Sequence, residues 1–468
     1  MLEIATPLRE PQAEPAPENE ASATIAESTV TLTSSTTLAS TPNKLQPPPE
    51  DTQTTETIRR NLIQEIPETE ERDLRVKEGE GTTERKRLVP WEPSDQIHVL
   101  GNDLPGRYIT HMLAGCQSIP PVRYLLPSHQ LWKDWVACGG KSTLHRGNQS
   151  TTNTRVVGEF IRPVNRPPKP YWPDTNEEVI HNLVVTVPAG LVLKSLEPIV
   201  HRLDHRSAIC LVQDGLGIVE DIIQAYFPDQ FTRPTFILGQ MTTRLRHPGS
   251  QFSVAELHQR PLYLSIYTPH GRGLTTPNLI KHHPPPERVL RQTHFLGLLT
   301  AMPGLIGQGE SMSNFLHRKI PTTAFRAVVD PVTTILDCTY DRIQSNKYAR
   351  ELIDNCIAEI CDVVSRFPEC RDLPAFRRLY LGTSLRREVY HMLHGQKTAD
   401  SAMRSRTSRG WETDIDYLTG YFVQRGRALK VSVSALETLL LAVKSRQTLV
   451  RSQWDKGISF EDDTKSPL

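Results

Sequence analysis

The sequence predicts an α/β domain with a parallel sheet, then an all-helical domain, behind an N-terminal segment without a core. The chain has 468 residues, and single cores stop growing near about 250 to 300 residues. Short apolar runs alternate with helical patterns up to about residue 287, which is typical of a parallel sheet. Beyond residue 288 the periodic segments have helical spacing only. We therefore expect a tail and linker over 1–95, the α/β domain over 96–287, the helical domain over 288–452 and a flexible tail over 453–468.

The N-terminal segment, residues 1 to about 85, is dominated by Pro, Glu, Ser and Thr. Stretches such as STVTLTSSTTLASTP contain no aromatic residue. Such a composition buries too little apolar surface to offset the entropy lost on ordering the chain, so we expect disorder.

The first domain begins with the apolar run IHVLG at 97–101, a predicted strand that leads into a helix over RYITHMLAG at 107–115. Further strands are predicted at VRYLL (122–126), LVVTV (183–187), AICLV (208–212) and PLYLSIYTP (261–269), with helical patterns between them. The Pro-rich KHHPPPERV suits an interdomain stretch.

The second domain is predicted to be helical because its apolar residues recur at intervals of three and four. The segments are DPVTTILDCTYDRI, YARELIDNCIAEICDVVSRF, LRREVYHMLHG, TDIDYLTGYFVQRGRAL and SALETLLLAVKSRQ.

Bulk composition excludes several function classes. The net charge is +1, from 54 basic and 53 acidic side chains, so neither nucleic acid nor a membrane surface is an expected partner. The 7 cysteines have no CxxC spacing, which predicts neither a disulfide framework nor a metal site. We expect an intracellular protein, cytoplasmic or mitochondrial, because the chain has no apolar span or signal core.

The turn after the first strand, GNDLPG, lies where a Rossmann-like domain carries its GxGxxG fingerprint. Gly101 and Gly106 match the first and third glycines, whereas Asp103 replaces the second, at which the backbone approaches the pyrophosphate. An ordinary strand-to-helix turn is the alternative interpretation.

Three longer segments resemble the ketopantoate reductase family, and the chain is identified as a degenerate, fungal-type member. They are LVQDGLGIVEDIIQAYFPDQFTRPTFILGQ (211–240), VVDPVTTILDC (328–338) and ETDIDYLTGYFVQRGRALKV (412–431). The resemblance implies a Rossmann-like domain followed by a helical domain of the 6-phosphogluconate dehydrogenase type. It also implies an NADPH-dependent reductase of a 2-oxoacid, converting 2-dehydropantoate to pantoate in pantothenate biosynthesis.

Cofactor-binding positions carried over from the family are Gly101, Asp103, Gly106, Ser128, Asp214 and Gly215. Ser128 stands where the family tends to place an Arg for the 2′-phosphate of NADPH, and a hydroxyl supplies no positive charge. Asp214 replaces an Asn, and an ionised carboxylate cannot donate a hydrogen bond.

Catalytic positions carried over are Lys319, Thr322, Ser401 and Asp414, with Arg326 and Asp330 as substrate-binding positions. Thr322 stands at the family's proton-donor Lys, and a threonine hydroxyl is a poor acid at neutral pH. Lys319, three residues earlier, is the candidate replacement. Asp414 replaces the Glu that holds the substrate hydroxyl, and Ser401 corresponds to the Ser that helps bind the substrate carboxylate.

Two hypotheses follow from these substitutions. The favoured one is a family member with an eroded active site, rather than an active reductase with rearranged residues and a 2-oxoacid substrate. The alternative is a non-catalytic binding or regulatory paralogue that keeps the two-domain fold. A homodimer or a protein partner is compatible with either. A decisive observation is whether the Lys319 ammonium points into the cleft near Asp414.

Overall fold

The computed structural model describes residues 91–164, 169, 171–268, 286–368, 383–396 and 400–457. All of them belong to one unit of the chain, Lys86–Leu468. The predicted disordered segment as far as residue 90, most of KHHPPPERV, and the chain after residue 457 lie outside the described residues.

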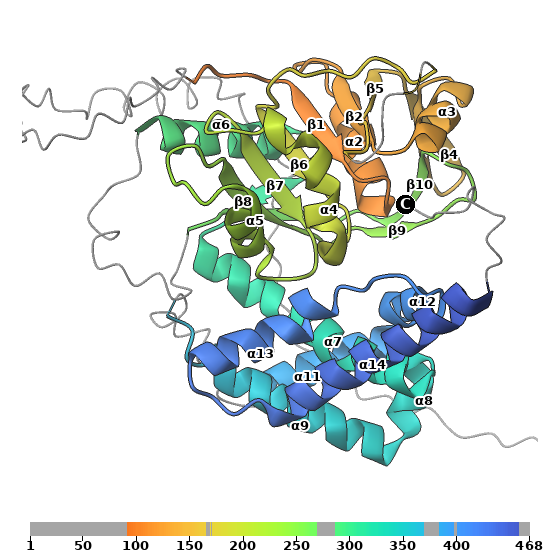
Figure 1. The fold of residues 1–468 in the computed structure, drawn as a ribbon, viewed down its shortest axis with the longest axis vertical. Coiled ribbons are helices and arrows are strands. Elements are labelled where there is room, and N and C mark those ends of the chain that lie inside the picture. Colours follow the sequence, from red (N-terminus) through yellow and green to blue (C-terminus); the bar gives the residue numbers. More distant parts are fainter. Residues whose placement is uncertain are drawn as a thin grey trace, which may run out of the picture. The chain divides into compact units, whose positions relative to one another are not determined.

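An eight-stranded sheet organises the first half of the described chain (Figure 1). Its order is β12-β11-β8-β7-β6-β1-β2-β5. The strands are β1 (Ile97–Leu100), β2 (Val122–Leu126), β5 (Val156–Phe160), β6 (Asn182–Val185), β7 (Ala208–Val212), β8 (Thr235–Met241), β11 (Leu262–Ile266) and β12 (Gly307–Gly309). Neighbouring strands are parallel except β8 and β11. The predicted mostly parallel sheet is confirmed.

Helices cover both faces of this sheet because its strands are apolar on both sides. One face packs against α2 (Leu104–Ala114) and α6 (Pro286–Ala301). The other packs against α4 (Val192–Leu196) and α5 (Ile218–Tyr226). Helix α6 crosses the boundary expected at residue 287, and β12 lies beyond it, so the sheet layer includes residues that were expected in the helical domain.

A second sheet of four strands, order β4-β3-β10-β9, was not predicted. Its strands are β3 (Ser142–Arg146), β4 (Gln149–Asn153), β9 (Arg244–Arg246) and β10 (Ser253–His258), and α3 (His129–Ala137) precedes β3. Strand β4 reads QSTTN and is almost wholly exposed, so it lacks the apolar alternation that marks a strand. The Gly147-Asn148 pair between β3 and β4 was the available signal, since such pairs favour hairpin turns.

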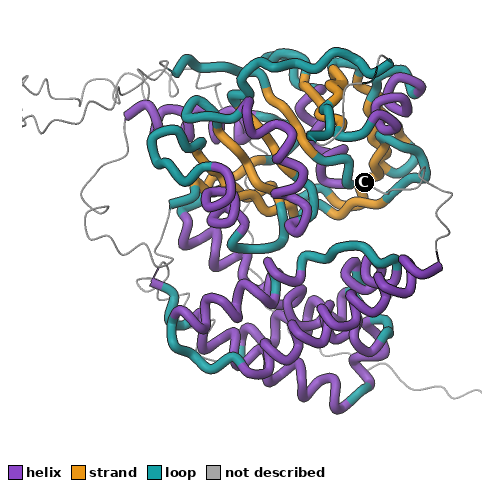
Figure 2. Tube along the Cα trace, in the orientation of Figure 1, coloured by secondary structure: helices purple, strands orange, loops and turns teal. Residues whose placement is uncertain are grey.

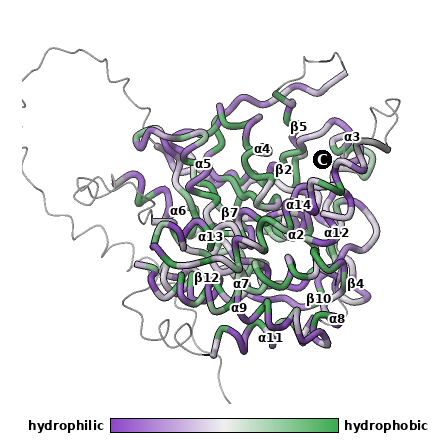
Figure 3. Tube along the Cα trace, turned by 60° about the horizontal axis from the view of Figure 1, so that its bottom comes forward, coloured by the Kyte–Doolittle hydropathy of each residue, from purple (hydrophilic) through white to green (hydrophobic). Residues whose placement is uncertain are grey.

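The second half of the described chain is helical, as predicted (Figure 2). The helices are α7 (Met312–Leu336), α8 (Tyr340–Ser345), α9 (Lys347–Val364), α11 (Ser384–Gly395), α12 (Ala402–Ser408), α13 (Thr419–Ala428) and α14 (Ser434–Gly457). Apolar and polar residues alternate along α9 and α11, which turn their apolar sides to one core (Figure 3).

Helix α7 is longer than DPVTTIL predicted, because it begins at Met312 and continues through Pro321 and Pro331. A proline inside a helix leaves the carbonyl four residues earlier without its helical N–H partner. For Pro331 that carbonyl belongs to Ala327, and the Thr419 hydroxyl of α13 donates a hydrogen bond to it. This side-chain bond lets the long helix pass through the core.

Candidate functional site

The turn between β1 and α2 needs both of its glycines for its own packing. Gly101 has φ +140°, and a Cβ there would lie 2.1 Å from the Thr186 hydroxyl oxygen. A Cβ on Gly106 would lie 2.0 Å from the Gly101 carbonyl oxygen. These glycines therefore establish a tight strand-to-helix turn, and they do not by themselves indicate a bound nucleotide.

Asp103 occupies the N-terminus of α2 as its capping residue. Its Oδ1 accepts hydrogen bonds from the Gly106 amide at 3.0 Å and from the Thr186 hydroxyl at 2.6 Å. Enclosure in the turn raises the pKa of Asp103 to about 6, although both hydrogen bonds oppose this rise. The Asp103 carboxyl group thus occupies the place at which the N-terminus of α2 would otherwise bind an anion.

This turn does not fit the pyrophosphate of a dinucleotide. A helix N-terminus binds phosphate through its free amide N–H groups. Here the Gly106 amide is bonded to Asp103, and Pro105, in the first turn, has no N–H. A phosphate would also face the Asp103 carboxyl group.

Ser128 caps the next helix, α3, where its hydroxyl oxygen accepts from the Leu131 amide at 3.1 Å. The neighbouring His129 contacts the aromatic rings of Trp132, Phe160 and Tyr171. The position predicted for a 2′-phosphate contact therefore serves to begin a helix beside an aromatic cluster.

A cavity of about 470 Å³ lies at the carboxyl ends of β6, β7 and β8, between this turn and the helical domain. Its charged lining residues are Asp103, Asp214, Asp414, Arg326 and Arg406. Ligands of parallel α/β sheets bind at this end of the strands, so this cavity is the candidate site. Gly215, by contrast, packs against the helical domain, since a Cβ there would lie 2.7 Å from the Tyr417 Cβ.

Four of the predicted residues come together beside this cavity, but they bind one another. Arg326 on α7 forms ion pairs with Asp214, after β7, and with Asp330 one turn later at 3.3 Å. Asp330 is 1% exposed, and the Tyr340 hydroxyl donates to its Oδ1 at 2.6 Å. Burial raises the pKa of Asp330, whereas Arg326 and hydrogen bonds from Tyr340 and Ser401 lower it. Ser401 is also buried as the cap of α12.

Asp214 has the strongest effect in raising the pKa of the Arg326 guanidinium above its ordinary value. Arg326 is therefore a fixed positive charge held between two carboxylates. Tyr340 is a member of this network that the sequence analysis missed, and its segment offered no pattern that would have identified it.

Lys319 does not line the cavity that contains Asp414. Its side chain is in the buried part of α7, 3% exposed, and its Nζ donates to the carbonyl oxygens of Gln213 at 2.5 Å and Gly239 at 3.3 Å. Burial lowers the pKa of Lys319 to about 8, although nearby Asp214 opposes the fall. Thr322 accepts a hydrogen bond from the Gln240 amide group at 3.3 Å.

Asp414 belongs to the segment between α12 and α13 and lines the cavity. Its Oδ1 accepts from the Gly190 amide at 3.0 Å, which connects the helical domain to the loop after β6. Burial raises the pKa of Asp414, and the Arg326 and Arg406 guanidinium groups lower it. Sequence reasoning missed Arg406 and Gln213, which line the same cavity, although it had placed the nearby Asp214 and Ser401 at the site.

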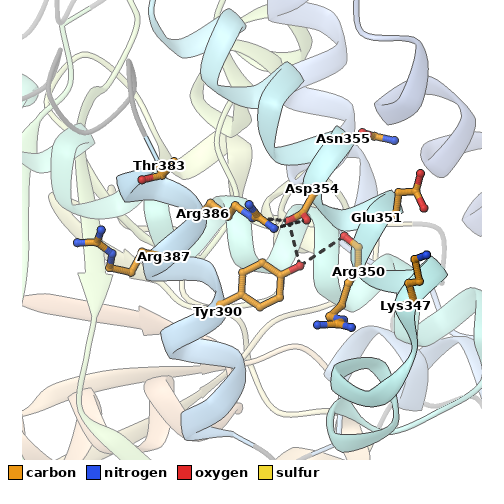
Figure 4. Close-up of a pocket in the computed structure, with 9 residues that line it drawn as sticks. All are labelled: Lys347, Arg350, Glu351, Asp354, Asn355, Thr383, Arg386, Arg387 and Tyr390. Atoms are coloured by element: carbon orange, nitrogen blue, oxygen red, sulfur yellow. Dashed lines mark hydrogen bonds and ion pairs between the residues drawn. The ribbon is translucent and has the colours of Figure 1, made fainter.

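A larger, open groove of about 730 Å³ lies between α9 and α11 (Figure 4). At its centre Arg386 pairs with both carboxylate oxygens of Asp354, at 2.8 and 2.6 Å, and the Tyr390 hydroxyl donates to the same group. Figure 4 shows Arg386 and Tyr390 pointing toward Asp354. These contacts link two helices, and exposed ion pairs of this kind contribute little to stability.

Metal centres and membrane-spanning helices are both absent from the part of the chain that the structure describes. No group of three or more His, Cys, Asp or Glu side chains is arranged to hold a metal ion there. Among those same residues, no helix has the length and apolarity to cross a bilayer.

The fold and the cleft define a class: a protein with a Rossmann-like parallel-sheet domain whose strand ends face a helical domain. The family model described as "Ketopantoate reductase PanE/ApbA" matches residues 97–283, and the model of its C-terminal part matches residues 314–447. The chain belongs to the ketopantoate reductase family, which confirms the resemblance inferred from sequence.

Individual relatives are distant. The protein named "Probable 2-dehydropantoate 2-reductase" from Schizosaccharomyces pombe is 24% identical over 293 residues, covering 59% of this chain and 77% of that protein. Among solved structures, D-mandelate dehydrogenase with NADH and anilino(oxo)acetate has a TM-score of 0.54 at 12% identity, over 76% of this chain and 99% of that one. The family's reductase from Ralstonia eutropha JMP134 has a TM-score of 0.54 at 13% identity, with the same coverage. At such identities the likeness shows the fold alone.

Proposed function

We propose that this chain is a ketopantoate reductase-family protein with an eroded active site, which binds a small molecule in its cleft and does not reduce ketopantoate with NADPH. The observation that supports this most directly is the placement of Lys319. Its ammonium is buried against the carbonyls of Gln213, which follows β7, and Gly239, in β8, and it is absent from the cavity lining, while Thr322 stands at the family's proton-donor position.

The cofactor position supports the same proposal. Asp103 and Pro105 remove two amide donors from the α2 N-terminus, and Ser128 itself supplies no positive charge. A site for NADPH needs positive potential and free donors around its phosphates. Family membership gives the fold, whereas activity depends on the residues of the site.

One observation favours the competing proposal of an active reductase. Lys319 has a pKa of about 8, close to the range in which an amine can act as a general acid near neutral pH. For this role the ammonium would have to leave the Gln213 and Gly239 carbonyl groups and enter the cleft.

A turnover assay separates the two proposals. We expect the purified full chain to show no ketopantoate-dependent NADPH oxidation above background, whereas ordinary enzymes turn over at about 1 to 1000 per second. Steady oxidation that is lost in Lys319→Met but retained in Lys194→Met, a change at an exposed lysine of α4, would contradict the proposal. It would also identify Lys319 as the replacement acid.

The cellular compartment of the protein is also part of this proposal. Cysteines without disulfide spacing support an intracellular protein, in the cytoplasm or in mitochondria. Immunofluorescence or fractionation of the full chain would distinguish these compartments.

A further inference from the structure

The cavity offers unpaired acceptors on its acidic side. Asp414 uses Oδ1 to accept from the Gly190 amide, and Asp214 uses Oδ2 for its ion pair with Arg326. Within the described part of the chain, the second carboxylate oxygen of each has no hydrogen-bond partner. Two carboxylate oxygens are thus available to a ligand that brings N–H or O–H donors.

Gln213 adds an unsatisfied buried acceptor behind the wall of the cavity. Its side chain is 7% exposed, and its amide nitrogen donates to the Val185 carbonyl at 2.8 Å. Its Oε1 has no partner among the described residues, although Gln213 lines the cavity. Buried acceptors are normally satisfied, and leaving one unpaired costs about 1 to 3 kcal/mol.

Arg406 places a positive charge on the same cavity. Its Nε donates to the Glu412 carbonyl at 2.6 Å, and its two terminal nitrogens have no hydrogen-bond partner in the described structure. A guanidinium group with both terminal nitrogens available can hold a carboxylate through two parallel hydrogen bonds. Arg326 cannot do this as readily, because Asp214 and Asp330 already hold it.

The rest of the cavity wall is largely apolar. Val212, Met241, Leu245, Met403 and Leu418 contribute to it. A ligand that fits this surface has an apolar body beside its charged groups.

We propose that this cavity binds a zwitterionic α-amino acid with an apolar side chain, its ammonium group at Asp414 and Asp214 and its carboxylate at Arg406. This inference rests on the proposed function, because it names the ligand of the same non-reducing cleft. A 2-oxoacid has a carbonyl oxygen, which needs donors and would face the free carboxylate oxygens. The ammonium group of the matching amino acid instead supplies three donors and a positive charge.

The test compares two ligands of nearly equal shape by calorimetric titration of the full chain. Leucine and 4-methyl-2-oxopentanoate differ in the ammonium and the carbonyl group. We expect leucine to bind at least tenfold more tightly. Asp414→Asn keeps an acceptor for the Gly190 amide but removes the charge, and should weaken leucine binding at least tenfold. Arg406→Gln should do the same.

Arg409→Gln provides the matched control. Arg409 is exposed, follows α12, and lies over the same Trp411 ring as Arg406, but does not line the cavity. Its substitution should leave leucine binding unchanged. Failure of leucine to bind, equal binding of both ligands, or an equal loss in all three variants would overturn the inference.

The turnover assay keeps this result separate from the proposed function. Ketopantoate-dependent NADPH oxidation would overturn the proposed function whether or not leucine binds. Absence of leucine binding in a chain without turnover would overturn only the amino-acid inference.

Discussion

At the scale of single residues, one carboxyl group determines what the first helix end can bind. Asp103 satisfies the Gly106 amide and accepts from Thr186, so it acts as a built-in anion at the N-terminus of α2. The sequence identified this residue as a departure from the glycine fingerprint. The sequence could not show that Asp103 caps the N-terminus of α2.

Removing this carboxyl group should strengthen nucleotide binding. Like charges about 4 Å apart repel by roughly 4 kcal/mol at an effective dielectric near 20. Because the pKa of Asp103 is about 6, its carboxylate can instead bind a proton near pH 7, which costs about 1.4 kcal/mol and limits the penalty to roughly tenfold in affinity. We expect very weak NADPH binding to the unmodified chain, stronger binding to Asp103→Gly, and a further gain with Ser128→Arg. Calorimetric titration checks this order. Micromolar NADPH binding by the unmodified chain, or no increase in NADPH affinity in Asp103→Gly, would contradict the prediction.

The pH dependence of stability should also carry the signature of Asp103. Its pKa rises from 3.8 to about 6 on folding, so the folded chain holds this proton more tightly than the unfolded chain. The resulting stabilisation is complete below about pH 4 and is lost as the pH rises through 6, with an upper limit of about 3 kcal/mol. Asp103→Asn keeps an acceptor for the Gly106 amide and should lose this dependence. Urea unfolding at pH 5 and pH 7.5 measures how much the free energy of unfolding changes with pH in each protein. An equal change in the unmodified chain and in Asp103→Asn would refute the prediction.

At the scale of elements, α7 connects the two layers of the molecule. Its first half approaches the sheet, where Lys319 bonds the Gln213 and Gly239 carbonyls, and its second half lies in the helical core. Helical spacing predicted a core helix here. The attachment of α7 to the sheet could not be predicted from the sequence, because the position of Lys319 in the chain does not reveal that its side chain is buried.

Lys319 should make stability rise with pH in an alkaline range. Burial lowers its pKa from 10.5 to about 8, so between these values the unfolded chain binds more protons than the folded chain. The free energy of unfolding should therefore increase from pH 8 toward pH 10, with an upper limit of about 3 kcal/mol from this group. Lys319→Met should remove this increase, while Lys194→Met should retain it. Chemical denaturation at several pH values is the measurement, and a rise of equal size in Lys319→Met would exclude the mechanism.

Across the whole molecule, short loops add contacts between the sheet and the helical domain to those that α7 makes. The Leu216 amide donates to the Tyr417 carbonyl at 2.9 Å, and Gly190 bonds to Asp414. Asp414 also lines the cavity, whose wall comes from both domains, so their relative position affects its shape.

The N-terminal segment should be dispensable for this structure. Its composition offers no core, and we expect limited proteolysis to leave a stable body that begins between Val89 and Gln96. Cooperative unfolding should persist after residues before about Arg85 are deleted. If deletion abolished the cooperative transition, the segment would have to pack against the body.

Residue types and their spacing were sufficient to predict the fold class, the family and the departures from the family's site residues. Apolar periodicity is a local property, so it located most strands of the main sheet and the helices of the second domain. It did not identify β4, whose residues are polar, or the ion pairs that Arg326 forms with Asp214 and Asp330. The three-dimensional structure was needed to show that Asp214, Arg326, Asp330 and Ser401 satisfy one another. It was also needed to show that Lys319 bonds the Gln213 and Gly239 carbonyls and that Arg406 and Gln213 line the cavity. Those outcomes depend on distances between segments far apart in the chain, which residue types and spacing do not encode.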